Sequence, residues 1–76
     1  MARRETLDDL LRDVLEARRF SLWCEEAGVY PWTVLRLRKG LGQRVHPGTV
    51  AVLAAKLRVP RERVMAAIEA SRAAAK

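Results

Sequence analysis

The chain has 76 residues, half of them hydrophobic and few of them aromatic, which predicts one all-α domain and excludes a multidomain protein. Its formal net charge of +6 favours an anionic partner, and its single cysteine, Cys24, excludes an internal disulfide. No apolar run approaches the roughly 18 residues of a membrane span and no signal peptide is recognisable, so we expect no membrane contact and a cytoplasmic or nucleoid location.

The first predicted helix runs from Thr6 to about Arg18. The Thr6 hydroxyl is a good N-terminal cap, and Asp8 and Asp9 suit the positive end of a helix dipole. The core-facing pattern i, i+3, i+4, i+7, i+8 is made by Leu7, Leu10, Leu11, Val14 and Leu15. The segment before it, 1–5, is expected to fray.

A second helix is predicted to start near Arg19 to Ser21 and to end at Ala27. Gly28 is expected to take the left-handed conformation that ends it, which costs other residues about 1 kcal/mol. Its apolar stripe contains Trp23, Cys24 and Ala27, and Cys24 is small enough for a second helix to approach closely.

The third helix is predicted from about Pro31 to Lys39, since proline suits a first helical turn. Val34 and Leu37 continue the apolar stripe and face the protein body, and Gly40 ends it. Val29, between the two helices, is expected to fill the angle that they form.

Two further helices complete the predicted five. The fourth starts at Pro47, with inward Val50, Leu53, Ala54 and Leu57, and Val59-Pro60 breaks it. The fifth starts near Arg61, with inward Val64, Met65 and Ile68, and frays after Ser71. We therefore expect a single domain over residues 1–76 with an ordered core of about 6–70.

The pattern from Phe20 to Gly40 resembles the helix-turn-helix of the phage repressor and Cro type, the XRE-like family. The matching residues are Trp23, Cys24, Ala27, Gly28, Val29, Val34, Leu37 and Gly40, and the run 47–59 is similar to the family's fourth helix. The resemblance covers roughly 7–68 and implies a five-helix repressor-like domain that binds double-stranded DNA and regulates transcription, as a repressor, with the third helix in the major groove. Arg19 and Phe20 depart from the family's usual Ser or Thr followed by Gln.

The resemblance implies that base edges are read from the start of the third helix. The DNA-binding residues expected there and just after it are Tyr30, Pro31, Trp32, Thr33, Arg36, Arg38, Lys39 and Arg44. Arg36 is the strongest candidate for a specific contact, because a guanidinium donates two hydrogen bonds to guanine. Arg38, Lys39 and Arg44 are assigned to phosphates, which give affinity without sequence information.

Trp32 is unusual at a position where the family has a small or polar residue. The indole has three readings: contact with DNA sugar or a thymine methyl, an anchor for a protein partner, or packing back over Pro31 or the loop. Tyr30, Trp32 and Leu35 together raise an alternative function, a protein-binding adaptor that contacts a polymerase or a larger regulator. Loss of a protein partner with Trp32→Ala alone would indicate the adaptor.

Charge is unevenly distributed along the chain. Residues 1–26 carry five basic and seven acidic side chains, whereas residues 27–76 carry ten basic and two acidic ones. No acid lies between Tyr30 and Gly48. A basic surface beside a projecting helix is typical of phosphate binding, although basic residues also simply keep small proteins soluble.

No catalytic or metal-binding pattern is present, so we expect neither an enzyme nor a cofactor. His46, the only histidine, has no cysteine or carboxylate cluster at metal spacing, and is assigned to a helix start or the surface, with a phosphate contact as the alternative. Cys24 is assigned to packing, with redox sensing as the alternative.

Family members bind palindromic sites as homodimers; here a homodimer would have to use the fifth helix or the loop before the fourth.

Overall fold

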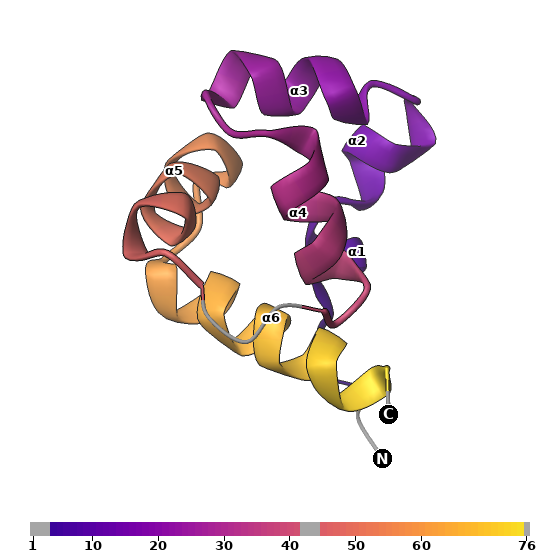
Figure 1. The fold of residues 1–76 in the computed structure, drawn as a ribbon, viewed down its shortest axis with the longest axis vertical. Helices are drawn as coiled ribbons and strands as arrows, with labels where there is room; N and C mark the ends of the chain where they lie inside the picture. The colour runs from indigo at the N-terminus through magenta and orange to yellow at the C-terminus, as the bar shows by residue number, and fades with distance from the viewer. Residues whose placement is uncertain (1–3, 42–44, 76) are drawn as a thin grey trace.

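The computed structural model of the protein describes residues 4–41 and 45–75. All the regular elements in this part of the chain are helices, and it contains no strand, as the composition predicts (Figure 1). Its helices are α1 (Leu7–Leu10), α2 (Arg12–Glu16), α3 (Phe20–Ala27), α4 (Pro31–Arg38), α5 (Pro47–Leu57) and α6 (Arg61–Ala74).

Six helices replace the predicted five because the first predicted helix is divided at Leu11. The backbone there has φ −94° and ψ 9°, outside helical values, although the Leu15 N–H still donates to Leu11 O at 2.9 Å. The bend lets α1 pack against α4 and α6 while α2 packs against α3. The predicted cap is confirmed, since Thr6 and Asp9 form a reciprocal capping box.

The connection between α3 and α4 follows the sequence prediction. Gly28 is left-handed, with φ +83°, and the Val29 N–H donates to Cys24 O at 3.0 Å. Val29 is half-buried against the core, and Pro31 occupies the first turn of α4. Three residues, 28–30, therefore connect the two helices.

The last two helices begin where they were predicted to begin. His46 caps α5, its Nδ1 accepting a hydrogen bond from the Gly48 N–H at 2.9 Å, which confirms the helix-start assignment. Helix α6 extends beyond Ser71 to Ala74. The prediction that Met65 points inward is wrong: its side chain is 41% exposed, because Val64 and Ile68 already occupy the stripe that faces the core.

The core lies where α6 crosses α1, α4 and α5, with α3 packing on α4 and α5 from the other end (Figure 1). In the view of Figure 1, α4 stands between α3 and α6. The buried cluster draws on five of the helices and includes Leu11 at the bend; its members are Leu7, Leu11, Cys24, Val34, Leu37, Val50, Leu53, Ala54, Val64 and Ile68.

Ser71 joins the start of α1 to α6. Its buried hydroxyl accepts the Leu7 N–H at 2.9 Å and donates to Ala67 O at 3.0 Å. Outside the core, the Arg63 guanidinium donates two hydrogen bonds to Glu5, each 2.9 Å long, and holds the pKa of that carboxyl below its usual value. The same stretch of chain is thus held against α6 at two points.

The turn after α4 lies against the end of α6. Gly40 has φ +73°, and a Cβ built on it would lie 2.6 Å from Ala75 Cβ and 2.8 Å from Ser71 O. A Cβ built on Gly28, in contrast, meets nothing within 4 Å. Gly40 is therefore required both for its backbone conformation and for the close approach, and Gly28 for its conformation alone.

These two glycines make a matched pair for a stability measurement. Gly28→Ala is expected to lower the free energy of unfolding by about 1 kcal/mol, the cost of a left-handed alanine. Gly40→Ala adds a steric conflict with α6, which typically costs a further 1–3 kcal/mol or so. Urea unfolding of both variants measures the difference; equal losses would contradict the close approach of Gly40 to α6.

Candidate nucleic-acid interface

Helix α4 has one buried face and one exposed face. Val34 and Leu37 are buried in the core, as predicted. Trp32, Arg36 and Lys39 follow one another at i, i+4 and i+7, so they lie along one side of the helix. All three are exposed, and Thr33 beside them is exposed as well.

Two of the sequence-predicted residues lie at the start of this face. Tyr30 caps α4 through its backbone, and its side chain is 81% exposed. Pro31 is half-buried in the first turn. The structure thus brings together, on and beside α4, one group of residues that forms the α4 face: Tyr30, Pro31, Trp32, Thr33, Arg36 and Lys39.

Arg38 does not belong to the α4 face. Its Nε–H donates to Asp8 Oδ1 at 2.5 Å, and its guanidinium carbon lies 4.9 Å from the centre of the Phe20 ring. Only 20% of the side chain is exposed. Arg44, the remaining candidate, lies outside the described residues.

The α4 face lies in a part of the chain without acids, since residues 27–61 contain no aspartate or glutamate. Arg36 and Lys39 make no ion pair with any described residue. Glu25 lines a hollow with Gly28, Val29, Tyr30 and Pro31 at the start of α4, and Asp8 lines a separate hollow with Arg38 and Lys39. Exposed cations without ion-pair partners are available to an anionic ligand.

Trp32 is 67% exposed, so most of its ring is open to solvent. This exposure disfavours packing back over Pro31 and leaves the DNA and protein readings open. Leu35 is half-buried and offers less apolar surface than the adaptor alternative assumed. The exposed aromatic surface at this end of α4 is therefore that of Tyr30 and Trp32.

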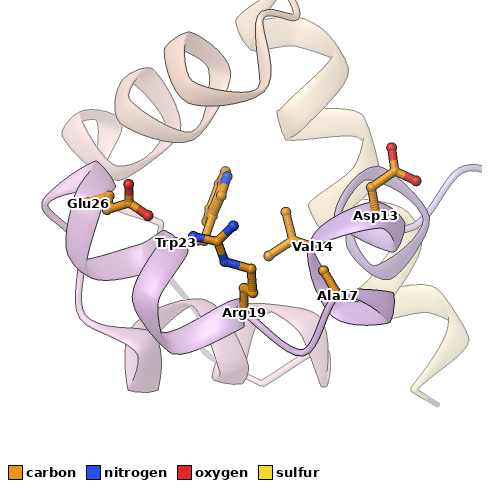
Figure 2. A pocket seen from close by; sticks show the side chains of 6 residues that line it. All are labelled: Asp13, Val14, Ala17, Arg19, Trp23 and Glu26. Carbon is orange, nitrogen blue, oxygen red and sulfur yellow. The ribbon is translucent and has the colours of Figure 1, made fainter.

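A second surface feature is a hollow between α2 and α3 (Figure 2). Val14, Ala17 and the half-buried Trp23 form its apolar part, and Arg19 and Glu26 lie beside the indole, whereas Asp13 points away from it. Arg19 and Glu26 bring one guanidinium and one carboxylate to this hollow, so its charge favours neither an anion nor a cation. It is separate from the α4 face, and sequence reasoning had not identified it.

The described residues contain no group of three or more histidine, cysteine, aspartate or glutamate side chains placed to hold a metal ion. Within the same residues no helix has the length and apolarity needed to cross a membrane. Cys24 is completely buried, and burial raises the pKa of its thiol, with the charge of Arg38 opposing the shift. The thiol therefore packs as a small hydrophobic group.

Comparison with protein families, curated proteins and solved structures found no match to this chain.

Burial makes a prediction about the reactivity of Cys24. Cys24 is completely buried and burial raises its pKa, so a disulfide reagent should modify the native protein much more slowly than the urea-unfolded protein. The unfolded thiol ionises first as pH rises, so above its ordinary pKa the stability of the fold should fall. Rapid modification of the native protein at pH 7 would instead support redox sensing.

Proposed function

We propose that the chain binds double-stranded DNA sequence-specifically through the α4 face and acts as a transcriptional regulator, a repressor by resemblance. The observation that carries this proposal is the exposed row of Trp32, Arg36 and Lys39 on a short helix whose opposite face is anchored in the core. A helix presented in this way fits the major groove. On this interpretation α3, residues 28–30 and α4 form a helix-turn-helix.

Different members of the α4 face are assigned different tasks. Arg36 is assigned to a base edge, because it lies one turn into the helix and its guanidinium has no ion-pair partner among the described residues. Lys39, at the end of α4, is assigned to a phosphate, since a lysine ammonium acts as a point charge. Thr33 is assigned to a thymine methyl or a phosphate.

A homodimer on a palindromic site belongs to the same proposal. Val64 and Ile68 are occupied by the core, so the large apolar side chain that α6 leaves exposed is Met65. Two copies would place two α4 helices one DNA turn apart. Selection of sites with two half-sites spaced by about 10 base pairs would support the dimer, and sedimentation as a monomer with and without DNA would count against it.

Arg36→Ala and Lys39→Ala test the two assigned tasks in selected duplex DNA. Arg36→Ala should weaken binding about 5- to 150-fold and relax the preference at one base pair. Lys39→Ala should weaken binding equally for all sequences and lower the slope of log K against log salt by about 0.9. Titrations at several salt concentrations between about 50 and 200 mM measure both effects.

Arg12→Ala provides a charge control, because it removes the same charge from an exposed position on α2, where the guanidinium lies 3.6 Å from Asp9 Oδ1. It should change DNA affinity little. If the unmodified protein binds no duplex at about 50 mM salt, the DNA proposal is wrong.

The exposed Tyr30 and Trp32 side chains support the second candidate, a protein-binding adaptor. Large exposed aromatics are typical of protein interfaces, where a few such residues supply most of the binding energy. On this alternative the partner is a polymerase or a larger regulator.

Trp32→Ala distinguishes the two functions. If the protein binds DNA, this change should weaken DNA binding, because the indole would lie against a sugar or a thymine methyl in the groove. If the protein is an adaptor, the change should abolish capture of the partner while Arg36→Ala preserves it. Binding assays of both variants against DNA and against the isolated partner make the comparison.

A further inference from the structure

Helix α4 carries two arginines in opposite surroundings. Arg36 is exposed, whereas the Nε–H of Arg38 donates to Asp8 Oδ1 at 2.5 Å and its guanidinium carbon lies 4.9 Å from the centre of the Phe20 ring. Asp8 belongs to α1 and Phe20 to α3. Arg38 therefore connects α4 to two other helices through its charged group.

We propose that Arg38 is a positioning residue: held by Asp8 and Phe20, it fixes the orientation of α4 for DNA and does not itself contact phosphate. This inference rests on the proposed function. It differs from the expectation drawn from the sequence, in which Arg38 binds a phosphate. The two assignments predict opposite responses to the loss of Asp8.

The geometry argues against a phosphate contact. Arg38 is two residues from Arg36 and therefore points to a different side of the helix. A phosphate at the Arg38 guanidinium would lie close to the Asp8 carboxylate, and the two anions would repel each other. The aromatic contact with Phe20 also uses the face of the guanidinium.

The expected effect is modest, because 52% of the Asp8 side chain is exposed and the pair is screened by solvent. Ion pairs of this kind change an equilibrium by about two- to fivefold. The Arg38–Asp8 pair favours the orientation of α4 that binds DNA. Losing the pair can weaken DNA binding by no more than the free energy with which the pair favours that orientation. A two- to fivefold loss is therefore the signal to be measured.

Asp8→Asn with Asp13→Asn as its control is the decisive comparison. Both aspartates lie in the first turn of a short helix, are exposed and lose the same charge, but Asp13 has no ion pair with the described residues. Asp8→Asn should weaken DNA binding about two- to fivefold relative to Asp13→Asn. Equal affinities, or tighter binding by Asp8→Asn as Arg38 is released to a phosphate, would overturn the proposal.

Two changes at Arg38 add a test that loss of stability alone would not reproduce. Arg38→Gln should weaken binding at an unchanged salt slope, whereas loss of a phosphate contact would lower the slope by about 0.9. Arg38→Lys keeps the charge but has no Nε–H and no planar group, so it should weaken binding as Arg38→Gln does. Full affinity in Arg38→Lys would indicate a phosphate contact. All titrations are made where each variant is fully folded.

Amide hydrogen exchange separates this proposal from the proposed function. In Asp8→Asn and Arg38→Lys the amides in the last turn of α4 should exchange faster than in Asp13→Asn, because the hydrogen bond between Arg38 and Asp8 of α1 is lost. If the protein binds no DNA but the variants exchange faster, the DNA proposal is wrong and the role of Arg38 in positioning α4 is supported. Unchanged exchange would overturn that role whether or not DNA binds.

Discussion

The close approach of the turn after α4 to the last turns of α6 is the constraint on which the position of α4 depends. A side chain at residue 40 would meet Ser71 O and the Ala75 side chain, so glycine allows the contact. Ser71 also accepts the N–H of Leu7. The same turn of α6 therefore contacts both the start of α1 and the end of α4. The position of the exposed α4 face depends on these contacts between the beginning, middle and end of the chain.

Much of this arrangement was predictable from local signals in the sequence. Thr6, Gly28 and Pro31 mark helix ends. The Thr6 hydroxyl accepts a free N–H of the first turn, Gly28 adopts the left-handed conformation that ends α3, and Pro31 occupies a first-turn position where no N–H is needed. The apolar spacing identified the inward side of α4, and the remaining residues of the helix were therefore expected on its exposed side. The helical period of 3.6 residues is sufficient to separate the two sides, because the direction of each side chain around a helix depends on the helix geometry alone.

The features that the sequence did not reveal depend on contacts between distant segments. The bend at Leu11 keeps the apolar spacing of a single helix, so periodicity cannot detect it. Met65 was assigned to the core because it is apolar, but it lies about a quarter-turn from the stripe that Val64 begins. Arg38 contacts Asp8, which is 30 residues earlier in the sequence, and Phe20, which lies on another helix. A count of basic residues cannot reveal these contacts and treats Arg38 and Arg36 alike.

The two tryptophans occupy different environments, one half-buried beside the hollow between α2 and α3 and the other exposed on α4. Indole emission shifts to longer wavelength as the ring becomes hydrated, so Trp32 should emit to the red of Trp23. Unfolding changes the surroundings of Trp23 far more than those of Trp32, whereas a ligand on α4 covers only Trp32. The protein thus contains two intrinsic optical reporters, one for the integrity of its fold and one for the occupancy of its exposed helix.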